Sequence, residues 1–243
     1  MNGSLYEKVA LLDPATPRQR ILALAEYPHL GSVLAVPILH IETATLARYW
    51  PIVWIPDGES FALAAIIGLR PKHGLTAHLE GLAGDAIPLA VKAFPLLLGP
   101  SAETGDAKVF IHAMPDLAND SAGESAFDSS GNLGPGTAAK ADILWLFAAE
   151  SAKTRAMTSA LVNAGGLGVW KLRFQFEDKS VTNEGYYAVE ASFLQDPQYI
   201  ALAGEHGPAF VAMIEHHILA RPRVQDLADK LGAGRQMSEA ETD

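Results

Sequence analysis

The chain has 243 residues, of which 49% are hydrophobic and 19% charged, the ordinary usage of a folded protein with a substantial core. Its formal net charge of −10 disfavours binding to nucleic acid or to an anionic membrane surface, because phosphates would be repelled. The absence of cysteine excludes disulfides, thiolate catalysis and cysteine-ligated metal centres.

The N-terminal residues lack the basic and apolar regions of a secretory signal. No apolar run reaches the roughly 20 residues that a membrane-spanning helix needs, so no membrane insertion is expected. We therefore expect a soluble cytoplasmic protein, with non-classical export left open.

The first 50 residues predict short elements interrupted by prolines. A strand is expected over residues 9–12, and a bent or edge strand over 32–40, where Pro37 removes a backbone donor. Thr43 then caps a short helix that runs through Trp50.

Residues 51–68 predict a β-hairpin. Pro56-Asp57-Gly58 separates two apolar runs, and this triplet favours a tight turn because proline presets φ and glycine accepts positive φ. Neither run alternates between apolar and polar residues, so we expect strands that are covered on both faces and lie in the core.

The chain continues with further strands and one long loop. Strands are expected over residues 75–79 and 108–112, and the polar, glycine-rich residues 115–137 predict a loop that is either functional or mobile. A long helix is predicted over 138–164, with apolar residues on one face and small residues plus Trp145 on the other, so we expect it to be buried on two sides.

The C-terminal third predicts a second hairpin and short helices. Residues 169–176 alternate with Leu172, Phe174 and Phe176 on one face, and 181–189 return as the partner strand. A last helix is expected over 209–220 and a disordered tail over 232–243, so that residues 1–231 form a single domain.

These elements predict an α+β fold. We expect a twisted, mainly antiparallel sheet around the 51–68 and 169–189 hairpins, packed against one long central helix and shorter C-terminal helices.

Two residues are weak candidates for catalysis. Glu150 falls on the apolar face of the long helix, where a buried carboxylate needs a partner, and His217 or Thr154 would be the natural one. Pairing with Lys153 or Arg155 is the structural alternative.

No metal site or cofactor is expected. His216 and His217 are adjacent on a helix and point about 100° apart, so they cannot both ligate one metal ion. The carboxylates around Asp128 lack the spacing of a calcium loop, and the glycines before the long helix lack the lysine of a phosphate-binding loop.

Several stretches, taken in order, resemble the SapC family of bacterial proteins. They are Val36-Pro37, Tyr49-Trp50-Pro51-Ile52-Val53, Ala65-Ile66-Ile67-Gly68-Leu69-Arg70, Phe94-Pro95-Leu96 and Ala126-Phe127-Asp128-Ser129-Ser130-Gly131. The resemblance covers about residues 9–220 and rests on the ordered set, since each stretch alone consists mostly of core and turn residues.

The resemblance implies an accessory or binding role without enzymatic activity. The family is named for a surface-layer (S-layer) gene cluster, and relatives are often encoded beside outer-membrane receptors of TonB-linked uptake systems and halogenase-like proteins. A protein partner is therefore expected, in a groove lined by exposed aromatic residues such as Trp50, Trp54 and Trp170, with Asp128 as a further ligand-binding candidate.

Two other functions stay open. One is an enzyme acting on a peptide or saccharide, in a pocket where Glu150 or His217 meets the 115–137 loop. The other is a structural surface-layer component that self-assembles. The oligomeric state is also open, with a homodimer among the alternatives.

Overall fold

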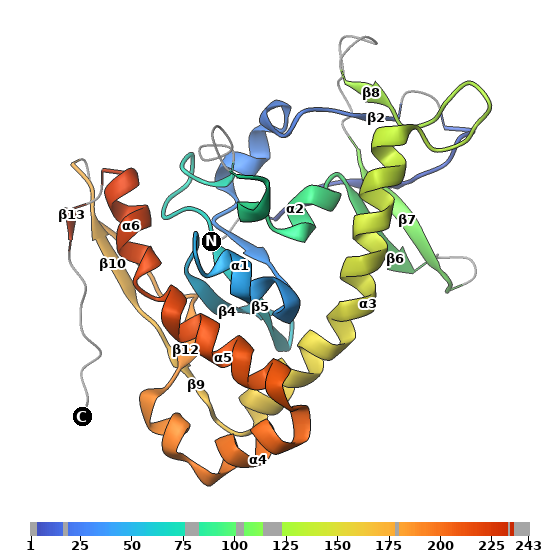
Figure 1. Ribbon diagram of the computed structural model, residues 1–243. Helices are drawn as coiled ribbons and strands as arrows, with labels where there is room; N and C mark the ends of the chain where they lie inside the picture. The colour runs from blue at the N-terminus through green and yellow to red at the C-terminus, as the bar shows by residue number, and fades with distance from the viewer. Residues whose placement is uncertain are drawn as a thin grey trace.

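The computed structural model describes residues 4–16, 19–75, 83–100, 105–113, 123–177, 180–232 and 234–235. Its centre is a five-stranded antiparallel sheet in the order β3-β5-β4-β12-β9 (Figure 1). The strands are β3 (Ala35–Pro37), β4 (Ile52–Asp57), β5 (Ser60–Ile66), β9 (Leu167–Val169) and β12 (Tyr187–Val189).

The β4–β5 hairpin confirms the prediction for residues 51–68. Its register pairs Asp57 with Ser60 across the turn, and Gly58 adopts the positive φ of 60° that the turn requires. The half of the hairpin near the helices is buried on both faces, as the unbroken apolar runs indicated.

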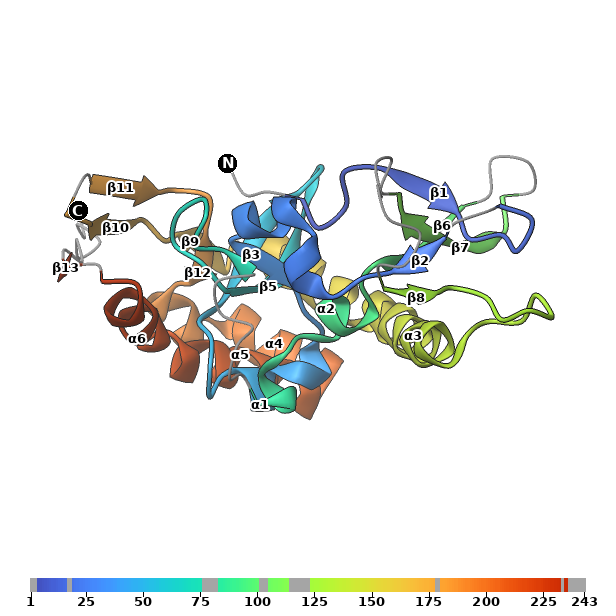
Figure 2. The same cartoon turned by 90° about the horizontal axis from the view of Figure 1, so that it is seen from above.

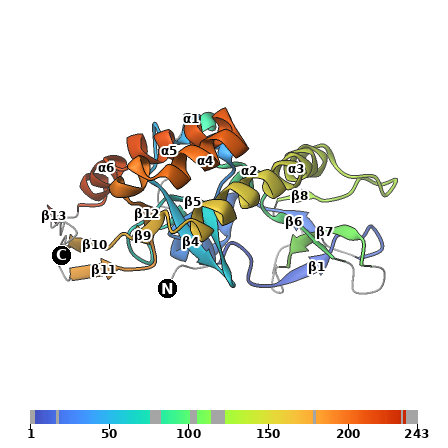
Figure 3. The same ribbon diagram turned by 90° about the horizontal axis from the view of Figure 1, so that it is seen from below.

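Helices cover one face of this sheet (Figure 3). They are α4 (Pro197–His206), α5 (Pro208–Ala220) and α6 (Arg223–Lys230). α6 was not predicted from the sequence. Pro222, which ends α5 as expected, stands at the N-cap of α6, where its missing N–H costs no helical hydrogen bond.

The long helix α3 (Pro135–Asn163) joins the central sheet to a smaller lobe (Figure 2). The smaller lobe contains one sheet of β1 (Val9–Leu11), β7 (Ala107–His112) and β6 (Leu96–Pro100), and a pair of β2 (Arg20–Ile21) and β8 (Glu124–Ser125). α3 packs its first half on the smaller core through Ala141 and Leu144, and its second half on the main core through Met157 and Leu161.

The expectation that α3 is buried on two sides is wrong for the middle of the helix. Trp145 and Leu146 are 49% and 46% exposed. The physical reason is that the helix buries a different face in each half, so the middle of the helix passes between two cores instead of lying inside one.

The predicted 169–189 hairpin is divided between two sheets. β9 and β12 pair with each other and join the central sheet, whereas β10 (Leu172–Gln175) pairs with β11 (Ser180–Asn183) and with β13 (Gly234–Arg235). The predicted alternation is confirmed, because Leu172, Phe174 and Phe176 are buried while Lys171, Arg173 and Gln175 are exposed.

Short helical segments complete the described chain. They are α1 (Thr43–Leu46), α2 (Leu89–Ala93) and the 3-10 turns η1 (Leu24–Glu26), η2 (Pro28–Ser32), η3 (His40–Glu42), η5 (Gly84–Ala86) and η6 (Ala191–Gln195). The expected strand at 75–79, the middle of the 115–137 loop and the end of the tail lie outside the described residues.

The mixture of antiparallel sheets, one long helix and shorter C-terminal helices confirms the α+β fold. Within the described ranges, no helix combines the length and the apolar character that crossing a bilayer requires.

Candidate functional site

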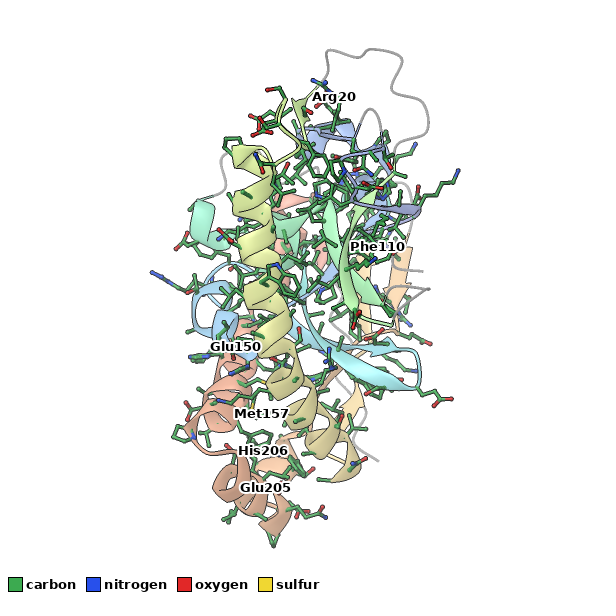
Figure 4. The ribbon with its side chains drawn as sticks, turned by 90° about the vertical axis from the view of Figure 1, so that its right-hand side faces the viewer. Arg20, Phe110, Glu150, Met157, Glu205 and His206 are labelled. Atoms are coloured by element: carbon green, nitrogen blue, oxygen red, sulfur yellow. The ribbon has the colours of Figure 1, made fainter. Side chains whose placement is uncertain are left out.

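The free end of the β4–β5 hairpin extends past both of its neighbours in the sheet. β3 pairs only with Ala64, Ala65 and Ile66 of β5, and β12 pairs with β4 through Tyr187 and Trp54. Residues 55–62 therefore project beyond the strands on either side, beside the middle of α3 (Figure 4).

Each edge of this free end borders a hollow. The helix-side hollow, of about 160 Å3, lies between the hairpin and α3 and is lined by residues 37–39, 55–57, 61–63 and five residues of α3. The loop-side hollow, of about 380 Å3, lies on the β4 edge and is lined by residues 181–186 with Leu34, Ile55, Pro56, Leu69 and Pro71.

Hydroxyl groups of α3 line the helix-side hollow, but each is already engaged. Ser151 Oγ donates to the Phe147 carbonyl at 2.6 Å, and Thr158 Oγ1 accepts from Trp54 Nε1 at 3.3 Å. Charged groups flank the same hollow, with Arg155 on α3 and Asp57 near the hairpin turn, and both side chains are exposed.

Thr154 links this hollow to the candidate Glu150. Its Oγ1 lies 2.9 Å from His40 Nδ1 and accepts the His40 backbone N–H at 3.2 Å, while His40 Nε2 lies 3.9 Å from Glu150 Oε2. Figure 4 shows Glu150 on the side of α3 that faces the segment with η3 and α1. Burial lowers the pKa of His40, nearby Lys153 lowers it further, and Glu150 opposes both effects.

The structure thus brings Glu150 to Thr154 and His40. Sequence reasoning named Thr154 but missed His40, which precedes α1 and carries no local signal. The expected meeting of Glu150 with the long loop is wrong for the described residues 123–134. They adjoin the start of α3, and the helix rises about 22 Å from Pro135 to Glu150.

His217 has a structural position in the sheet. It is fully buried, with Nδ1 2.6 Å from the Ile52 carbonyl and Nε2 accepting the Val189 N–H at 3.2 Å. Continuing the Tyr187–Trp54 register by two residues would pair Val189 directly with Ile52. The imidazole of His217 therefore stands between two backbone groups that would otherwise bond to each other, and it bridges β4 to β12.

The neutral ring of His217 fits this bridge. Because Nε2 accepts a hydrogen bond, the proton lies on Nδ1, which donates to Ile52. Burial lowers the pKa of His217 to about 4, and Arg221 acts in the same direction.

The expectation of three exposed tryptophans is wrong for Trp50 and Trp54. Trp50 is 3% exposed and donates from Nε1 to the Ala86 carbonyl at 2.7 Å, and Trp54 is fully buried against the His217 ring. Trp54 is therefore covered by α5, and Trp50 is fixed to η5. Trp170 is half-buried, with the Arg221 guanidinium 5.2 Å above its ring.

Asp128 organises the turn in which it lies. Its carboxylate accepts the N–H groups of Ser130 at 2.8 Å and Asn132 at 2.9 Å, and these bonds lower the pKa of Asp128. This is the usual role of an aspartate at the start of a turn.

Glu42 is a buried carboxylate that sequence reasoning missed. Glu42 accepts the N–H of Leu39 at 2.8 Å and that of Leu89 at 2.7 Å, which fixes η3 to the start of α2. Burial raises the pKa of Glu42, against the lowering effect of these two bonds. Among the residues that the structure describes, no three histidine or carboxylate side chains are grouped closely enough to hold a metal ion.

Comparison with known proteins places the chain in one family. No curated protein and no solved structure matches it. The family model described as SapC matches residues 18–227, which include the central sheet, α3, α4, α5 and the first part of α6. The chain therefore belongs to the SapC family.

Proposed function

We propose that the protein is a non-enzymatic accessory protein that binds a protein partner, in a bacterial cell-surface or uptake system, and that it does so at the helix-side hollow. The observation that carries the proposal is the hollow itself. It lies beside a hairpin end that extends beyond its sheet neighbours, and the α3 hydroxyls that line it are already engaged in hydrogen bonds.

The hollow is better suited to binding than to nucleophilic catalysis. A catalytic hydroxyl needs an accessible oxygen and a base that can take its proton. Thr154 is 5% exposed, and its oxygen also lies 3.1 Å from the Glu150 carbonyl, in the position of an ordinary helix back-bond.

An enzyme acting on a peptide or saccharide is the second candidate, because Thr154, His40 and Glu150 form a hydroxyl–imidazole–carboxylate row. Hydrolysis of chromogenic peptides or glycosides that is lost in Glu150→Gln, with the fold retained, would favour this candidate over the first.

Purified products of the neighbouring genes test the proposal when they are passed over the immobilised protein. Ser151 lines the hollow and Ala152, the next residue, is exposed and does not. We expect one neighbouring protein to be retained by the wild type and by Ala152→Trp, and to be lost with Ser151→Trp because the indole fills the hollow. Equal retention by both variants would place the partner elsewhere, and no retention by any form would contradict the proposal.

A further inference from the structure

The edge of β5 is uncovered where the helix-side hollow begins. β3 ends at Pro37, and the last bond along this edge is from the Ile38 N–H to the Leu63 carbonyl at 2.9 Å. The chain then turns into η3, so nothing in β3 continues past Leu63 toward the hairpin turn.

The register shows which backbone groups face this edge. Ile66 donates to Pro51 at 2.9 Å, so Ile66, Ala64 and Ala62 direct their N–H and C=O groups toward β4. The residues between them point the other way, as the Ile38–Leu63 bond confirms. The N–H and C=O of Phe61 therefore face the hollow, and within the described chain no hydrogen bond joins either of them.

The opposite edge of the hairpin is poorly suited to pairing. The residue of β4 that faces outward there is Pro56, which has no N–H, and the N–H of Gly185 opposite it is bonded to Asn183 Oδ1 at 3.0 Å. A strand added at the loop-side hollow could bond only to the carbonyl of Pro56 on this edge, whereas Phe61 offers both a donor and an acceptor.

Charge adds a second feature to the β5 edge. Arg155 on α3 and Asp57 near the hairpin turn both line the helix-side hollow, and Arg155 has no ion pair or hydrogen bond within the described residues. The uncovered stretch from Ser60 to Ala62 is about 10 Å long, enough for three residues of an extended chain.

We infer that this edge receives an extended, acidic peptide segment of a partner by β-strand addition. The segment lies antiparallel to β5 in line with β3, exchanges both backbone hydrogen bonds with Phe61, and places a carboxylate beside Arg155. The inference rests on the proposed function and specifies its binding mode: backbone bonds hold the segment, and the hollow selects its side chains.

A library of random ten-residue peptides displayed on phage tests the inference. The library is selected on the whole protein and counter-selected on Phe61→Pro, which removes the edge donor while leaving the bonds between β4 and β5. We expect enriched peptides with an aspartate or glutamate. Their synthetic forms should bind Phe61→Pro at least tenfold more weakly than the wild type, and Phe61→Leu, which keeps the N–H, within about threefold. Arg155→Gln should weaken the acidic peptide but not its amide analogue.

Methylation of the peptide backbone gives a readout that does not depend on the variants folding. N-methyl groups should abolish binding at alternate positions only, because alternate residues of an added strand face β5. The inference would be overturned if no peptide were enriched. It would also be overturned if peptide affinity were the same for Phe61→Pro as for the wild type and did not depend on which residue carries the N-methyl group. A dimer that Phe61→Pro dissociates would overturn it too, because the edge would then belong to a second copy.

The two proposals can fail separately. A neighbouring protein that is lost with Ser151→Trp but retained by Phe61→Pro would keep the proposed function and exclude strand addition.

Discussion

Replacing His217 by alanine should lower the free energy of unfolding by about 4 kcal/mol at pH 7. The substitution leaves a space in the core and leaves the Ile52 carbonyl and the Val189 N–H without the imidazole that joins them. Urea unfolding measures the change. His216→Ala is the matched control on the same helix. His216 is half-buried and bonded through Nδ1 to Thr43 Oγ1 at 2.9 Å, so its loss should cost about 1 kcal/mol.

The same bridge should make stability depend on pH. The pKa of His217 is about 4 in the folded protein against its ordinary 6.5, so the unfolded chain takes up the proton first as the pH falls. The contribution of neutral His217 to the free energy of unfolding is complete above about pH 6.5. It is lost progressively toward pH 4, by about 3 kcal/mol in total. The free energy of unfolding of His217→Gln should fall less than that of the wild type over this pH range. It should still fall somewhat, because His40 and His112 also titrate there. If the free energy of unfolding fell equally steeply with pH in the wild type and in His217→Gln, the bridging role of His217 would be contradicted.

Replacing Trp54 by alanine should also cost about 4 kcal/mol, because its side chain is fully buried and its Nε1 donates to Thr158. Trp170→Ala is the matched control. Its ring is half-buried and contacts the Arg221 guanidinium, so a loss of about 1 kcal/mol is expected. Urea unfolding of the two variants tests this difference, and we expect the lower midpoint for Trp54→Ala. Equal midpoints would mean that Trp54 does not stabilise the core.

Local patterns in the sequence predict the elements that depend on neighbouring residues. The prediction that Pro56 is a turn residue is wrong, because Pro56 lies in β4 opposite Phe61. Gly58 does lie in the turn of the hairpin, and the alternation from Leu172 to Phe176 sets the buried face of β10. These signals do not depend on the rest of the fold, and the structure confirms them.

Other features depend on packing between distant segments. The 169–189 hairpin divides between two sheets at Trp170 and Lys171 on one strand, opposite residues 184–186 on the other. The ring of Trp54 packs against His217 of α5, which lies more than 150 residues later in the chain, and Trp50 bonds to Ala86 of η5. No local pattern records these contacts.

The candidate site shows the same limit. Glu150 was selected because of its place on the apolar face of the helix, but its partner His40 comes from a turn 110 residues earlier. His217 was a catalytic candidate because of its residue type, and only the register of β4 and β12 shows it as a bridge between strands. The open edge at Phe61 follows from where β3 ends, which the sequence indicates only through Pro37.

The central claim is that Phe61 offers its backbone to a partner strand. Residue-resolved amide hydrogen exchange, on the protein alone and with a saturating selected peptide, tests it most directly. We predict that the Phe61 amide exchanges at least tenfold more slowly in the complex, while the Ala62 amide, already directed toward Ile55, changes little. An unchanged Phe61 amide in a complex shown to be formed would contradict the account.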